Sequence, residues 1–144
     1  MKRIVVDASV MIKWILGDKQ EADQEKAFAL LQAWVHGRAE ISAPFLWQYE
    51  VGNFLGREIP DEAEEKMKLL LNLNIVNIGL SEIIYRQCFL WMREDNITFY
   101  EACYLAAAHA TDADLITADV RFAVKMGKRG RICLLKDLDI VNEP

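Results

Sequence analysis

The stretch Ile4-Val5-Val6-Asp7-Ala8-Ser9 near the N-terminus decides the fold that this sequence predicts. Three β-branched apolar residues in a row are typical of a strand that is buried on both faces, as in a parallel sheet. The run ends at Asp7, and the residues from 8 to 16 have a helical pattern that stops at Gly17. A short buried strand that leads directly into a helix indicates an α/β protein.

The same alternation continues along the chain, so we expect a three-layer α/β/α sandwich with a central parallel sheet. The 144 residues contain no linker or repeat, which predicts one domain over residues 1–144. Pro44 is expected at the first position of a helix, and Ser81 and Thr98 are expected to cap two others. Strands are expected at residues 4–6, 40–43, 75–78, 115–117 and 132–135, and helices at 8–16, 20–36, 44–58, 61–73, 81–93, 98–110 and 119–127.

The composition restricts the functional classes. The formal net charge is −5, so nucleic acid would be bound through a local basic surface or a bound cation, not through the overall field. Three cysteines without a paired motif are expected to be buried, reduced thiols, which suits the cytoplasm. No uncharged run approaches the roughly 20 residues of a membrane helix, and the first apolar run is too short for a signal peptide, so we expect no membrane association.

Four carboxylates are predicted to meet at one edge of the sheet. Asp7 and Asp119 follow strands, and Glu50 lies in the second turn of a helix that leaves a strand. Glu101 begins a helix that runs back toward the start of the next strand, so it should lie at the same carboxyl edge, where α/β proteins bind ligands. Asp112 enters a strand from the other end, as does Asp114, and both are excluded.

Each carboxylate also has a purely structural interpretation. Asp7 would form a turn at the end of its strand, and Asp119 would cap its helix. Glu50 lies in an apolar helix and would need a partner such as Arg57 if it bound no ligand. Glu101 follows Thr98 at the spacing of a capping box, which leaves a metal role and a capping role equally open.

Four neighbouring carboxylates require a counter-charge, and an oxygen-only ligand set suits Mg²⁺ or Mn²⁺. Such a cation generates hydroxide and stabilises charge on a reacting phosphate. His36 and His109 are predicted at helix ends on the far side, which disfavours a zinc site and histidine-based chemistry. Lys13 and Arg121, early in helices that leave this edge, are candidates for RNA contact.

Other conspicuous residues have structural interpretations that we favour. The basic cluster Lys125, Lys128, Arg129 and Arg131 is expected to be a solvated turn at the far edge, with a partner subunit or an acidic partner segment as the alternative. The four tryptophans are expected in the core, with one or two exposed at an interface as the alternative; they are Trp14, Trp34, Trp47 and Trp91.

Four segments resemble the PIN-domain ribonucleases, specifically the VapC-type toxins of prokaryotic toxin–antitoxin pairs. The first is residues 4–9, and the second is Tyr49-Glu50-Val51-Gly52-Asn53. The others are residues 98–106, with Glu101, and Leu115-Ile116-Thr117-Ala118-Asp119. Their order and spacing match those of the family across nearly the whole chain.

The resemblance implies a Mg²⁺- or Mn²⁺-dependent endoribonuclease that is inhibited by a cognate antitoxin and forms homodimers. Asp7, Glu50 and Asp119 match the acidic positions of the family. Ser9 and Thr117 match small polar residues that hold metal waters or carboxylates, and Asn53 is a further candidate for this role. The family usually has aspartate where this chain has Glu101. Two possibilities stay open: the longer side chain of Glu101 reaches the cation, or it turns instead into the capping box.

Three alternatives compete with this hypothesis. A PIN-fold binding module would keep the fold without catalysis. A phosphoacceptor receiver domain shares the α/β pattern and Mg²⁺, but it would leave Glu50 and Glu101 unexplained. A structure-specific DNA nuclease would need additional helical elements to grip DNA.

Overall fold

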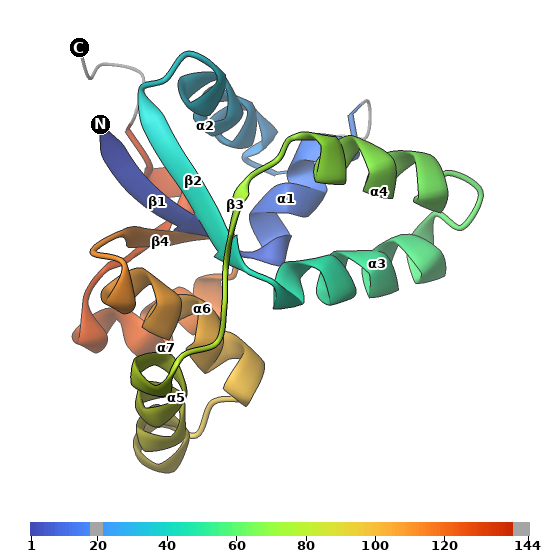
Figure 1. Ribbon diagram of the computed structural model, residues 1–144. Coiled ribbons are helices and arrows are strands. Elements are labelled where there is room, and N and C mark those ends of the chain that lie inside the picture. Colours follow the sequence, from blue (N-terminus) through green and yellow to red (C-terminus); the bar gives the residue numbers. More distant parts are fainter. Residues whose placement is uncertain (18–21, 140–144) are drawn as a thin grey trace.

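Five strands and seven α-helices make up the computed structural model, which describes residues 1–17 and 22–139 (Figure 1). The strands are β1 (Lys2–Val6), β2 (Ala39–Pro44), β3 (Val76–Ile78), β4 (Asp114–Thr117) and β5 (Ile132–Leu134). The helices are α1 (Ala8–Ile15), α2 (Gln24–Val35), α3 (Leu46–Glu58), α4 (Ala63–Asn72), α5 (Glu82–Asp95), α6 (Phe99–Ala110) and α7 (Val120–Met126). Two short 3₁₀ turns, Gly127–Arg129 and Leu135–Asp137, flank β5.

The strands form one parallel sheet in the order β3-β2-β1-β4-β5. The central strand β1 is the one that the opening apolar run predicted, and Ile4, Val5 and Val6 are fully buried. Helices lie on both sides of the sheet, so the expected α/β/α sandwich is confirmed (Figure 1). Helix α2 packs against β2 on one face, α6 packs against β1, β2 and β4 on the other, and α3 and α4 form a hairpin that contacts α1.

The strand order places a topological switch point between β1 and β4. From β1 the chain proceeds outward to β2 and β3, and from β4 it proceeds in the opposite direction to β5. Helices that leave neighbouring strands in opposite directions open a crevice at the carboxyl edge, where ligands bind in open α/β sheets. Val6 pairs with Ile116 at the end of the ladder, so Asp7 and Thr117 come next to each other at this crevice.

Several expectations need correction. Pro44 is not the first residue of a helix but the last residue of β2, where it lies opposite Ile78 in the ladder. A proline is tolerated there because it ends the strand and its missing N–H breaks no further bond. The predicted helix start at residue 20 and the last residues of the predicted domain, 140–144, lie outside the described residues. A receiver domain is also contradicted, because the strands of a receiver follow the order 2-1-3-4-5, whereas those of this chain follow the order 3-2-1-4-5.

Candidate active site

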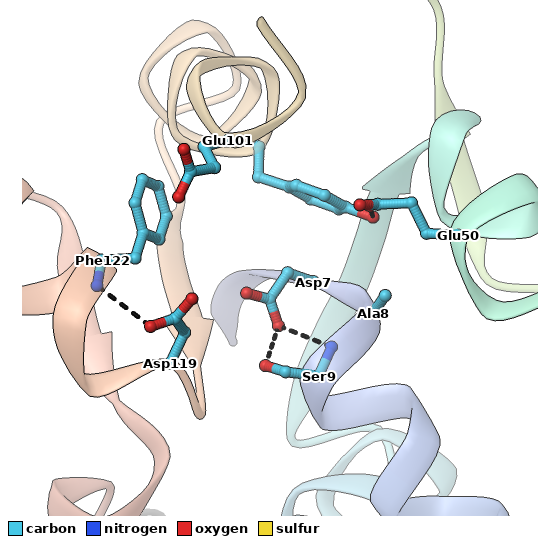
Figure 2. A pocket seen from close by; sticks show the side chains of 8 residues that line it. Asp7, Ala8, Ser9, Glu50, Glu101, Asp119 and Phe122 are labelled. Atoms are coloured by element: carbon cyan, nitrogen blue, oxygen red, sulfur yellow. Dashed lines mark hydrogen bonds between the residues drawn. The ribbon is translucent and has the colours of Figure 1, made fainter. Parts of the chain in front are cut away.

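A cavity of about 160 Å³ opens at the switch point, and all four predicted carboxylates line it (Figure 2). Asp7 and Asp119 face each other from the ends of β1 and β4, Glu101 enters from α6, and Glu50 enters from α3. Ala8, Ser9, Tyr104 and Phe122 complete the wall. The four acids therefore converge, as their places at the carboxyl edge predicted.

Asp7 is held by the backbone and side chains around it. It is the N-cap of α1, and its Oδ1 accepts hydrogen bonds from the Ser9 amide at 3.1 Å and from the Ser9 hydroxyl at 2.5 Å. Its Oδ2 accepts a hydrogen bond from the Thr117 hydroxyl at 2.5 Å. Asp7 as a residue is only 8% exposed. These contacts hold the Asp7 side chain in place where it lines the cavity.

Burial raises the pKa of Asp7 to about 6, from an ordinary value of 3.8. The hydrogen bonds from Ser9 and Thr117 stabilise the ionised form and oppose this shift, and the charge of Glu50 adds to it. A buried carboxylate that is partly protonated near neutral pH is one that a neighbouring cation would stabilise. The electrostatics of Asp7 thus favour a positively charged ligand in the cavity.

Asp119 combines a capping role with a place in the cavity. Its Oδ1 accepts a hydrogen bond from the amide of Phe122 at 3.1 Å, which makes it the N-cap of α7. Its own amide donates to the Thr117 hydroxyl at 3.1 Å. Thr117 therefore links the two aspartates, because the same hydroxyl donates to Asp7 and accepts from Asp119. The capping interpretation is correct, and it fixes a carboxylate that also lines the cavity.

Glu101 forms the capping box of α6. Its Oε1 accepts hydrogen bonds from the Thr98 amide at 3.0 Å and from the Thr98 hydroxyl at 3.2 Å, and its amide donates to Thr98 Oγ1 at 3.0 Å. Both hydrogen bonds to the Glu101 carboxylate use Oε1, and Glu101 still lines the cavity (Figure 2). The longer side chain thus reaches its cap while it remains at the site.

Glu50 is held by Tyr104, a residue to which no motif in the sequence assigned a role. The Tyr104 hydroxyl donates to Glu50 Oε1 at 2.6 Å, across 54 residues of sequence, and the tyrosine is only 4% exposed. Burial raises the pKa of Glu50, the hydrogen bond from Tyr104 lowers it, and the charge of Glu101 raises it. Arg57, the expected alternative partner, lies instead 3.6 Å from Glu58.

The supporting residues fall into two groups. Ser9 and Thr117 hold the Asp7 carboxylate, as described above, and the Ser9 hydroxyl also accepts a hydrogen bond from the Ala118 amide at 3.0 Å. Asn53 lies outside this cavity and lines a neighbouring one that shares Glu50.

The two candidates for RNA contact differ. Arg121 is exposed in the first turn of α7, close to the aspartate that caps this helix, as expected. Lys13 is only 9% exposed and lies in the last turn of α1, at the end of the helix that is distant from the cavity. Its predicted contact with a phosphate is therefore not supported.

The basic cluster is partly exposed, as expected of a solvated turn, but its side chains also pair with acidic and carbonyl oxygens. Arg129 contacts Asp95 at 3.0 Å and Glu94 at 2.7 Å, and Lys128 contacts the same Asp95 at 2.8 Å. The Asp95 side chain is only 1% exposed, and these cations lower its pKa. Lys125 donates to the Asn96 carbonyl, and Arg131 pairs with Asp112. The cluster thus ties the segment after α7 to the end of α5 and to the turn before β4.

The remaining predictions concern the core. Trp14, Trp47 and Trp91 are buried, and Trp34 is half-buried. The three cysteines are free; Cys88 and Cys103 are buried, and Cys133 is half-buried.

Among the described residues, no helix is both long and apolar enough to cross a membrane.

Comparison with known proteins decides the family. The profile of the PIN domain matches residues 4–127, which include the four strands from β1 to β4, apart from the first two residues of β1, and all four carboxylates. The chain belongs to the PIN domain family. This assignment agrees with the sandwich architecture and with the resemblance that the four segments indicated.

Individual relatives extend over most of this PIN domain protein. Ribonuclease VapC1 of Mycobacterium tuberculosis (strain CDC 1551 / Oshkosh) is 29% identical over 146 residues, which cover 94% of this chain and 100% of the relative. A toxin-antitoxin complex from Klebsiella pneumoniae contains a similar chain, with a TM-score of 0.67, 18% identity, and coverage of 94% of this chain and 99% of that one. The Sarcin-Ricin loop cleaving toxin VapC20 of Mycobacterium tuberculosis has a TM-score of 0.62 and 17% identity, with coverage of 84% and 93%.

Proposed function

We propose that this PIN domain protein is an endoribonuclease that cleaves RNA phosphodiesters with Mg²⁺ or Mn²⁺ and acts as the toxin of a toxin–antitoxin pair. The observation that carries the proposal is the convergence of four carboxylates on one cavity, with the pKa of the buried Asp7 raised to about 6. The similarity to Ribonuclease VapC1 over its whole length supports the same conclusion.

The donor set fits a hard divalent cation. All four acids offer oxygen ligands, which Mg²⁺ and Mn²⁺ prefer. In the described parts of the chain, no three acidic, histidine or cysteine side chains stand close enough to enclose a metal ion together. Mg²⁺ usually keeps several waters and takes only one or two direct carboxylates, so its binding does not require three such ligands in contact with it. Asp7 and Asp119 would hold the cation directly, and Glu101 would hold it through water.

When bound, the cation would lower the pKa of a water and stabilise negative charge on the reacting phosphate. The residues of the chain provide the orientation. Ser9 and Thr117 hold the Asp7 carboxylate, and Tyr104 holds Glu50. Glu50, whose pKa is raised by burial, would orient the attacking water and accept its proton. Attack at phosphorus breaks the bond to the 3′ oxygen and leaves 5′-phosphate and 3′-hydroxyl ends.

The proposal includes partners and a location. A cognate antitoxin protein would inhibit the enzyme, in line with the toxin-antitoxin complex from Klebsiella pneumoniae that shares the fold. Helix α5 exposes Ile83 to 73% and Phe89 to 53%, and apolar groups of this size are often covered by a protein partner, here the antitoxin or the second copy of a homodimer. The enzyme would act in the cytoplasm, where RNA is present and free thiols stay reduced.

The test is an RNA cleavage assay with the purified protein. We expect single-stranded RNA to be cut in Mg²⁺ or Mn²⁺ but not in EDTA, with products that accept a 3′ adapter without prior removal of a phosphate. Cleavage that persists in EDTA would contradict the metal-dependent mechanism. Binding of Mn²⁺ without cleavage of any RNA would favour the binding-module alternative.

A further inference from the structure

A second, larger cavity lies directly beside the carboxylate cavity. Its volume is about 420 Å³, and Glu50 lines both cavities. Volumes of ~300–1,000 Å³ are typical of sites for small organic groups. The other lining residues are Leu46, Tyr49, Asn53 and Tyr100. A substrate chain that reaches the carboxylates therefore has an open, mostly apolar space next to its reacting phosphate.

Two tyrosines are the main features of this cavity. Tyr49 comes from α3 and is 77% exposed, and Tyr100 comes from α6 and is 62% exposed. Each is the sequence neighbour of a carboxylate, Tyr49 of Glu50 and Tyr100 of Glu101. Exposed aromatic rings near a cleavage site are suited to stack unpaired nucleobases, because every base presents a π-face.

The charges around the site favour a base at this position. Glu50 would repel a phosphate in the second cavity, whereas a base is neutral and is not repelled. Arg121 in the first turn of α7 is exposed near the carboxylates, whereas Lys125, Lys128 and Arg129 contact Asp95 or a backbone carbonyl. None of these four cations lines the second cavity, so contacts without charge would supply the affinity for RNA there.

We propose that this cavity binds one base of a single-stranded RNA, from the nucleotide next to the scissile phosphate, by stacking on Tyr49 and Tyr100. The side-chain amide of Asn53, which lines the same cavity, is placed to hydrogen-bond the edge of that base. The inference rests on the proposed ribonuclease function, and it assigns that function a nucleotide subsite.

The experiment measures RNA binding separately from cleavage. Short single-stranded oligoribonucleotides with 2-aminopurine at successive positions are titrated with protein in EDTA, where the proposed mechanism is inactive, and KM and kcat are measured in Mg²⁺. The variants are Tyr49→Ala and Tyr100→Ala, with Tyr49→Phe to retain the ring. Tyr85→Ala is the matched control, because Tyr85 is an exposed tyrosine (39%) outside the cavity.

We expect Tyr49→Ala and Tyr100→Ala to raise the dissociation constant and KM about 5- to 150-fold, the range for loss of one stacked base. Tyr49→Phe and Tyr85→Ala should bind like the wild type. One 2-aminopurine position should be quenched on binding to the wild type and not on binding to the alanine variants. An abasic nucleotide at that position should make the wild type and Tyr49→Ala bind equally.

Two results would overturn the subsite. The first is unchanged affinity in both alanine variants. The second is a changed sedimentation coefficient with unchanged RNA affinity, which would make the surface a protein interface. Failure of the ribonuclease proposal is seen separately, as absence of cleavage by the wild type in either metal, because the binding measurement in EDTA does not require cleavage.

Discussion

The hydrogen bond from Tyr104 to Glu50 gives the sharpest prediction about the active site. Tyr104→Phe removes only the hydroxyl that lies 2.6 Å from Glu50 Oε1, and the ring remains to fill the same buried space. The fold should therefore persist, with a thermal midpoint close to that of the wild type. Any loss of activity then reports on how Glu50 is positioned.

The size of the effect follows from the type of bond. A hydrogen bond to a charged group contributes about 1.5–3 kcal/mol, which corresponds to roughly 10- to 150-fold in a rate. Glu50 is only partly buried, so water replaces part of the lost bond, and we expect a decrease in kcat/KM of about 10- to 100-fold. The hydrogen bond also lowers the pKa of Glu50. Its loss should move the acidic limb of the pH–rate profile to higher pH.

The assay is the pH dependence of kcat/KM on single-stranded RNA, measured as a double-mutant cycle with Glu50→Gln. If Tyr104 acts through Glu50, Tyr104→Phe should have little further effect in the Glu50→Gln background. Tyr85→Phe, on an exposed tyrosine elsewhere, is the control. An unshifted acidic limb, or a full additive loss in the Glu50→Gln background, would refute a positioning role for Tyr104.

Three further predictions concern stability. The native state holds the proton of Asp7 more tightly than the unfolded chain, so the free energy of unfolding should fall by about 3 kcal/mol as pH rises from about 3.8 to about 6. In metal-free urea titrations, the free energy of unfolding of Asp7→Asn should thus exceed that of the wild type by up to about 3 kcal/mol at neutral pH and equal it below about pH 4. A variant less stable than the wild type at neutral pH would contradict the predicted direction of this difference. Thr98→Ala should lower the free energy of unfolding by about 1 kcal/mol, because the N-cap is lost. Glu101→Gln should keep the capping box and the thermal midpoint but lower the cleavage rate at least about tenfold. Full activity of Glu101→Gln would leave Glu101 with a capping role alone. Asp95→Asn should lower the thermal midpoint at neutral pH, because Lys128 and Arg129 lose their buried partner. These cations lower the pKa of Asp95, so the midpoints of Asp95→Asn and the wild type should converge as pH falls through that pKa. Equal midpoints at neutral pH would contradict this prediction.

The parts of the site that follow from local pattern could be predicted from the sequence. Asp7 and Asp119 each end a strand of apolar residues, and parallel strands bring such ends to one edge whatever the order of the strands. The capping box of Thr98 and Glu101 depends on residues three apart and was equally visible. These features require only the type and direction of each element.

Features that depend on how the elements pack could not be predicted in this way. The contact of Tyr104 with Glu50 joins α6 to α3 across 54 residues, and the contact of Arg129 with Asp95 joins segments 34 residues apart. Lys13 was placed near the site because α1 starts there, but a helix advances about 1.5 Å per residue, and Lys13 lies in its last turn. Pro44 continues β2 because β3 pairs with it, which a single strand does not reveal.

The central claim, that the carboxylate cavity cleaves RNA, is tested most directly by comparing Asp7→Asn with Asp112→Asn in Mg²⁺. Asp112 is a matched control, because its side chain is 74% exposed and pairs with Arg131 at the opposite edge of the sheet. We predict that Asp7→Asn lowers the rate of RNA cleavage at least about 100-fold while it stays folded, and that Asp112→Asn cleaves at the wild-type rate. Cleavage by Asp7→Asn at the rate of the Asp112→Asn control would contradict the assignment of catalysis to this cavity.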